Sequence, residues 1–324
     1  GATTGTRNPG GAYDTATLST HNGWQEVEYF ANQTNLFVNQ NIAGMKHEFI
    51  IGLEYTDHKV LNGVYDIGNS GQNCITGTGS VKNAWCIFNK DGSVVSGVNG
   101  IMNRDIKKGG WDQDWQARTI STYIMDTVDL SEKWTAFGGL RYDRTTISLT
   151  TQNATTGAQT LNTESTEGMW NGHFGLTYKF LPYANVYATY SSAQDLNGGE
   201  SDVGTSAGYG GLVTFNGSAA GAKPEISENI ELGTKWNLMD NKLLATASVF
   251  QITKSDVMEG ANYVSAGTFN TGKNRVQGIE FGLAGNLTEK LSAFGGVTFM
   301  DSEVLESFTQ ANVGKTLSNF ADTT

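Results

Sequence analysis

The stretch that decides the fold is WNGHFGLTYKF, residues 170–180. Successive side chains of a β-strand point to opposite faces, so alternate positions share a face. One row is mostly apolar and contains Trp170, Gly172, Phe174, Leu176, Tyr178 and Phe180. The other row is mostly polar and contains Asn171, His173, Gly175, Thr177 and Lys179. The period of two predicts a strand with one apolar and one wet face.

The same alternation recurs in at least four other segments, which gives the chain an all-β character. These segments are residues 47–56, 133–143, 279–283 and 291–300. Residues 243–253 are ambiguous, because apolar residues fall on both faces. We predict ten strands between about Glu26 and Val304, and an eleventh that begins near Lys315.

The connections between these strands alternate strictly between short and long. Short turns are predicted at residues 42–46, 130–133, 181–184, 237–241 and 287–289. Long polar stretches are predicted at residues 60–110, 151–167, 194–223, 258–273 and 302–315. A soluble β-sandwich also alternates, but several long structureless loops count against a compact soluble domain. Short turns at one rim and long loops at the other are typical of an outer-membrane barrel.

Aromatic residues lie within a few positions of the short turns, where the interface of a bilayer favours rings with a wet tip. They are Trp134, Tyr178, Phe180, Tyr183 and Trp236. The alternative is that strand ends simply favour aromatics. Together with the loop asymmetry, these positions predict a transmembrane antiparallel up-and-down β-barrel.

Composition agrees with this fold class and excludes others. The 324 residues include 41 glycines and only 3 prolines, which excludes collagen and Pro-rich linkers. The net charge of −11 and the absence of Lys/Arg clusters argue against binding to nucleic acid. No run approaches 18 apolar residues, so no transmembrane helix is expected. Barrel strands need only about 9–11 alternating residues.

The two cysteines, Cys74 and Cys86, lie in a stretch rich in Gly, Asn and Ser. Their spacing does not form a CxxC motif. A local disulfide that closes a surface loop in an oxidising compartment fits best, with two unpaired thiols as the alternative.

Several motifs resemble those of the TonB-dependent siderophore receptors, with the catecholate-type receptors as the closest pattern. The longest is KPEISENIELGTK at residues 223–235, followed by a short turn and a strand that ends near Phe250-Gln251-Ile252. NRVQGIEF at 274–281, GKTL at 314–317, GLRYD at 139–143 and, more loosely, KHEFIIGLEY at 46–55 extend the match.

The resemblance implies a protein of the bacterial outer membrane with a 22-stranded barrel, an N-terminal plug domain and a segment that engages TonB. Residues 1–324 are then expected to be a partial barrel domain of 10–11 strands, without the plug and the C-terminal strands. The implied function is import of a ferric siderophore, catecholate-like, by TonB-coupled active transport. The implied partners are that siderophore, TonB through the missing N-terminal region, and outer-membrane lipid.

No catalytic or metal-binding pattern emerges, so no enzyme activity, resident cofactor or metal is expected. The four histidines show no HxxxH spacing, and no GxSxG elbow occurs. Charged residues on the wet faces are expected to line the lumen, where charge is tolerated. They are Arg141, Asp143, Glu231, Lys235 and Glu280.

A bulky aromatic anion would be recognised by aromatic planes and cationic donors on the long loops. The candidates for ligand binding are Trp85, Arg104, Trp111, Trp115, Tyr209 and Tyr263, with Lys107 and Lys108 beside them. Packing within a loop is the alternative role for each. A passive porin, or a surface-binding barrel without transport, is the alternative function. A porin would need opposed acidic and basic rows, and the basic residues here are too dispersed for one.

Overall fold

The computed structural model describes residues 15–17, 23–69, 84–86, 93, 104–196, 214–215, 218–219, 223–257, 259, 270–288, 290–318 and 320–321. Side chains are described within these ranges at 23–66, at 93 and from 106 onward, except at 214–215 and 218–219. The chain divides into two compact units. The first contains Gly1–Val27, Val60–Asp114 and Thr150–Asn162. The second contains Glu28–Lys59, Trp115–Leu149 and Thr163–Thr324.

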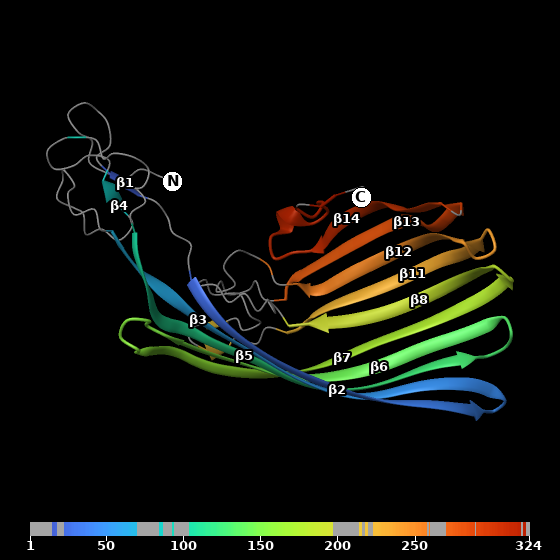
Figure 1. Ribbon diagram of the computed structural model, residues 1–324, viewed down its shortest axis with the longest axis horizontal. Helices are drawn as coiled ribbons and strands as arrows, with labels where there is room; N and C mark the ends of the chain where they lie inside the picture. The colour runs from blue at the N-terminus through green and yellow to red at the C-terminus, as the bar shows by residue number, and fades with distance from the viewer. Residues whose placement is uncertain are drawn as a thin grey trace. The chain divides into compact units, whose positions relative to one another are not determined.

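Ten strands form one sheet in the order β14-β13-β12-β11-β8-β7-β6-β5-β3-β2, so neighbours in the sheet follow the order of the chain (Figure 1). They are β2 (Gly23–Ile42), β3 (Met45–Asn69), β5 (Arg104–Asp129), β6 (Trp134–Gln152), β7 (Gln159–Leu181), β8 (Ala184–Asp195), β11 (Glu225–Leu238), β12 (Leu243–Val257), β13 (Gly272–Thr288) and β14 (Leu291–Glu306). Two short pairs lie outside it, β1 (Thr15–Thr17) with β4 (Ala84–Cys86) and β9 (Thr214–Phe215) with β10 (Ser218–Ala219). A 3-10 turn, η1, covers Gln310–Asn312.

The predicted up-and-down order of ten strands and all five short turns are confirmed. The turn between β2 and β3 is typical: Ala43 and Gly44 both have positive φ, 52° and 81°. Two residues with positive φ match the right-handed twist of the strands that they join. Past β14, Gly314 and Lys315 exchange backbone hydrogen bonds with Val304, but no strand is assigned there among the described residues.

Three of the predicted long loops were wrong at their edges, and in the stretch 302–315 the strand β14 continues to Glu306. Residues 151–167 are mostly strand, because β6 runs to Gln152, β7 begins at Gln159, and Asn153 closes the turn by a hydrogen bond to Ala158. The stretch 60–110 likewise contributes the ends of β3 and β5. Residues 151–167 are polar on both faces, whereas residues 60–65 carry apolar side chains on both faces, so neither segment has the alternation by which the other strands were recognised.

The face that carries Trp170 and Phe174, here called the outer face, exposes large apolar side chains. The exposed fractions of these two residues are 56% and 57%. One outer row is apolar across six strands: Leu176, Ala188, Leu232, Val249, Ile279 and Phe299 are successive partners. An apolar band of this extent on a soluble protein would cause association, so it is a surface for lipid.

Aromatic rings form two contacting groups on the outer face near the short turns. Trp134 stacks on Tyr178 with ring centroids 4.5 Å apart. Trp236 contacts Phe180 at 5.4 Å and Tyr183 at 6.2 Å. These are the five aromatics predicted to lie at a membrane interface, and the structure brings them together.

The inner face carries Asn171 and His173 and is mostly polar. On this face, aromatic rings of one strand lie directly over glycines of the neighbouring strand. A methyl group on Gly52 would lie 2.0 Å from Tyr123 Cζ. On Gly175 and Gly233 it would lie 2.1 Å from Phe137 and 2.4 Å from Tyr187. Only glycine allows this approach, in which a ring covers the backbone of the next strand. The ambiguity of residues 243–253 has the same cause, because Phe250 lies on the inner face and covers Gly278.

Candidate functional site

A network of charged residues occupies the inner face of β3, β5 and β6. Arg141 donates from Nε to Asp143 Oδ1 at 2.7 Å, and from both terminal nitrogens to Glu54 at 3.2 and 3.3 Å. Ser121 accepts from Arg141 at 2.8 Å and donates to the same Asp143 oxygen. Asn171 donates to the other oxygen of Asp143 at 2.9 Å. The predicted inner position of Arg141 and Asp143 is therefore confirmed.

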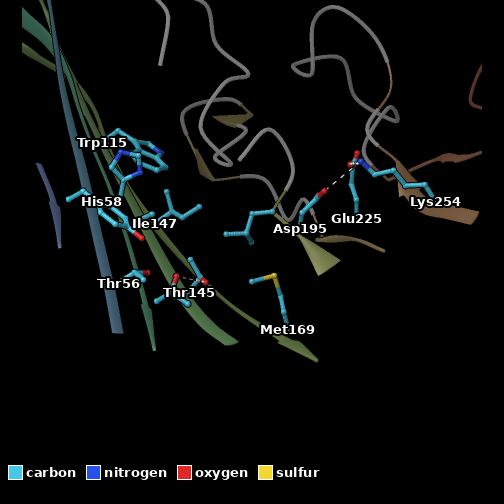
Figure 2. A pocket seen from close by; sticks show the side chains of 13 residues that line it. Thr56, His58, Trp115, Thr145, Ile147, Met169, Asp195, Glu225 and Lys254 are labelled. Carbon is cyan, nitrogen blue, oxygen red and sulfur yellow. Dashed lines mark hydrogen bonds and ion pairs between the residues drawn. The ribbon is translucent and has the colours of Figure 1, made fainter. Parts of the chain in front are cut away.

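Further toward the ends of the strands remote from the short turns, the inner face contains a cavity of about 560 Å³ (Figure 2). This volume suits a small organic ligand. All lining residues belong to the second compact unit. They are Tyr29, Thr56, His58, Trp115, Ala117, Thr119, Thr145, Ile147, Met169, Asp195, Leu196, Glu225 and Lys254.

One side of the cavity is aromatic. The imidazole of His58 lies between two rings, with centroid distances of 5.3 Å to Trp115 and 5.6 Å to Tyr29, both edge to face. Trp115 is only 3% exposed, whereas Tyr29 is 65% exposed. The buried Trp115 therefore fixes the cluster, and Tyr29 presents a ring to a ligand.

The other side is charged and joins the ends of β8, β11 and β12. Lys254 forms ion pairs with Glu225 and, at 3.6 Å, with Asp195. Figure 2 shows these three residues across the cavity from His58 and Trp115. The register explains their meeting, because Glu225 pairs with Asp195 and Ser227 with Lys254.

The candidate ligand residues from the sequence do not all come together. Trp115 lines the cavity. Trp111 lies in the first compact unit, where its carbonyl accepts from Gln152 at 3.1 Å. Trp85 and Arg104 lie in β4 and at the start of β5, and nothing of their side chains is described. Tyr209 and Tyr263 lie outside the described residues.

Lys108 is already engaged within the first unit. Its ammonium lies 4.0 Å from the ring centroid of Trp24 and 2.8 Å from Glu26. Lys107 also has an interaction partner. The predicted Cys74–Cys86 disulfide is not supported by a bond among the described residues, since Cys74 lies outside them, and it stays a prediction.

The sequence did not single out most of the cavity. His58 is one of the four histidines without ligand spacing, and no motif in the sequence points to Lys254. Alternation within a strand places His58 and Trp115 on inner faces, but only the register between β3 and β5 makes them neighbours. For the charged side, the KPE motif that contains Glu225 was a usable signal.

A second polar cluster surrounds Glu259, beyond the end of β12. Its carboxylate accepts from Thr271 Oγ1 at 2.6 Å, from the Phe308 amide at 2.7 Å and from Ser307 Oγ. Burial by itself would raise the pKa of Glu259, but the hydrogen bonds from Phe308, Ser307 and Thr271 outweigh it and lower the pKa. The charged carboxylate therefore holds the segment after β14 against the start of β13.

Acidification is expected to release this contact. A lowered folded pKa gives a stabilisation that is present above the ordinary glutamate pKa and is lost as pH falls through the folded value. We expect hydrogen exchange of the Phe308 amide, corrected for its intrinsic rate, to accelerate over that range. Glu259→Gln should be less protected and insensitive to pH, and exposed Glu306→Gln should behave as wild type. Equal protection in Glu259→Gln and wild type would contradict the assignment.

Two absences hold for the part of the chain that the structure describes. No group of three or more His, Cys, Asp or Glu side chains is placed to hold a metal ion. Among the same residues, no helix has the length and apolar character needed to cross a bilayer.

A polar inner face and an apolar outer face with aromatic rings near the short turns define the wall of an outer-membrane β-barrel. The chain belongs to a family of this class, described as "TonB dependent receptor-like, beta-barrel", which it matches over residues 2–324. Its location is the bacterial outer membrane.

Three curated relatives carry receptor names. The "Probable TonB-dependent siderophore receptor PiuA" of Acinetobacter baumannii is 27% identical over 305 residues, which are 90% of this chain and 38% of the relative. The "Probable TonB-dependent receptor BfrD" of Bordetella pertussis is 29% identical, over 88% of this chain and 37% of the relative. The "Catecholate siderophore receptor Fiu" of Escherichia coli K12 is 26% identical, over 82% and 34%.

The crystal structure of PiuA from A. baumannii superposes with a TM-score of 0.69 at 23% identity, over 91% of this chain and 41% of PiuA. This likeness supports the barrel fold. The chain thus spans between 34% and 38% of the length of the curated relatives named above.

Proposed function

We propose that this chain is part of the wall of a receptor that imports a ferric siderophore across the outer membrane, with energy supplied through TonB. The chain would serve in a longer polypeptide, with further strands and a plug domain. Its partners would be the siderophore as cargo, TonB and outer-membrane lipid, with no nucleic acid. The protein would be a transporter rather than an enzyme and would need no resident cofactor.

The cavity on the inner face carries this proposal. A ligand held there by Tyr29 and His58, with the buried Trp115 supporting them, would lie inside the barrel wall, on the side that a transported molecule must pass. The proposed ligand class is catecholate-like, because catechol rings stack on aromatic side chains. The match to a catecholate receptor among the relatives supports the same class. Trp85, Arg104, Trp111, Tyr209 and Tyr263 stay candidates for contacts before the ligand reaches the cavity.

A passive porin is the second candidate. It would line a constriction with a row of basic residues opposite a row of acidic ones. Among the inner-face residues that the structure describes, Arg141 and Lys254 lie against carboxylates, and Lys235 lies 5.1 Å from the ring centroid of Tyr187. These cations are dispersed and engaged, which favours the receptor.

Uptake of iron in cells tests the proposal. Iron-limited cells that lack other catecholate receptors and produce this receptor are expected to accumulate radioactive iron from a ferric catecholate only when TonB is present. A protonophore should abolish uptake, because TonB is energised by the inner membrane. Receptor abundance at the surface is the control for each strain. Equal uptake with and without TonB would overturn the transporter and favour the porin.

A further inference from the structure

The charges that line the inner cavity do not balance. Lys254 is the one lysine or arginine among the described lining residues, and it lies between Glu225 and Asp195. The side chain of Glu225 is 11% exposed and that of Asp195 is 61% exposed. The described lining residues thus provide one ammonium beside two carboxylates, and Asp195, in the longer of the two pairs, is the more accessible carboxylate.

The aromatic side of the cavity favours a different part of the ligand, a flat ring. Tyr29 offers an exposed ring, and His58 and Trp115 are held edge to face behind it. A flat ring would be accommodated against this side. The ligand would therefore meet rings at one end of the cavity and carboxylates at the other.

We propose that the cavity selects an aromatic iron chelator that carries a protonated amine, with the ring against Tyr29 and His58 and the ammonium at Asp195. This inference rests on the proposed function and narrows its ligand class. A ferric ion bound by three doubly charged catecholates keeps three negative charges, which the carboxylates of the cavity would repel. An ammonium arm on each ring cancels the three negative charges of the complex. One of these ammonium groups can then form an ion pair with Asp195.

A matched series of three probes isolates the charge of the arm. The probes are the ferric complexes of 4-(2-aminoethyl)catechol, 4-ethylcatechol and 3,4-dihydroxyphenylacetate, which share the chelating ring and differ in carrying a positive, neutral or negative arm. Binding to the receptor in lipid nanodiscs would be measured by isothermal titration calorimetry. We expect the affinity to decrease in that order, with about a two- to fivefold difference between the amine and the neutral arm, the size of one partly exposed ion pair.

Two substitutions should move this preference in opposite directions. Asp195→Asn removes the accessible carboxylate and should bring the amine and ethyl probes to nearly equal affinity. Lys254→Met removes the competing ammonium and should increase the preference for the amine. Glu228→Gln is the matched control, because Glu228 lies on β11 three residues from Glu225 and bonds Tyr190 on the outer face. This control should leave all three affinities unchanged.

The outcomes separate this inference from the proposed function. If TonB-dependent uptake occurs but the three probes bind equally, or the carboxylate probe binds best, the inference is wrong and the receptor stands. If the Asp195→Asn variant keeps the full preference for the amine probe, Asp195 does not select the ligand by the charge of its arm, and the inference is wrong. If uptake does not depend on TonB, the proposed function fails whatever the order of the probes.

Discussion

Replacing Val249 with arginine is expected to destabilise the receptor by about 2–4 kcal/mol, the cost of a cationic side chain on the lipid face near the middle of the bilayer. Val249 lies in the apolar outer row between Leu232 and Ile279 and is 47% exposed. In water this exposure would be harmless to a charged residue. In a membrane the guanidinium loses its hydration, and the residues paired with position 249 on the outer face, Leu232 and Ile279, are apolar.

Ser248 provides the matched control, because it is the adjacent residue of β12 and faces inward beside Glu280. Ser248→Arg should be tolerated, with a change below about 1 kcal/mol, since a lumen charge stays solvated or pairs with a carboxylate. Urea titration in liposomes and the amount of folded receptor in the outer membrane would measure both variants. Equal stability of the two variants would contradict the assignment of the faces.

The second large effect is expected at Arg141. Arg141→Met leaves Glu54 and Asp143 without their cation, and the side chain of Asp143 is only 8% exposed. Removing one partner of a half-buried ion pair leaves the charge of the other partner uncompensated. This is expected to lower the free energy of unfolding by about 3 kcal/mol. The midpoint of urea unfolding should fall accordingly. Adding Asp143→Asn to this variant should recover part of the loss, because it removes the stranded charge.

A surface pair is the comparison for Arg141. Arg118 lies 3.8 Å from Glu164, with side chains 47% and 59% exposed. Arg118→Met should therefore change the stability by less than about 1 kcal/mol. If Arg141→Met costs no more than Arg118→Met, the inner network does not stabilise the wall in the way described.

The sequence predicted the faces and the turns well, because both depend on neighbouring residues. Alternation alone assigns Phe174 and His173 to opposite faces, and Ala43-Gly44 permits a tight turn. The prediction from alternation was wrong at residues 151–167, because both faces of the strands there are polar. The cavity was also missed, since the meeting of Lys254 with Asp195 depends on the register across three strands. Trp115 was proposed as a ligand contact because of its residue type and loop position, not its neighbours.

The rings that cover glycines on the inner face have a consequence for how the wall assembles. Tyr123, Phe137 and Tyr187 each fit only where the adjoining strand has no side chain. If one strand slips by a single residue, its apolar row turns inward; if it slips by two, each ring meets a side chain instead of bare backbone. These ring–glycine pairs therefore favour the correct register over shifted registers while the strands of the sheet associate. A glycine-to-alanine change at such a site would slow correct insertion and increase the share of misassembled protein, even where the finished wall can absorb a methyl group.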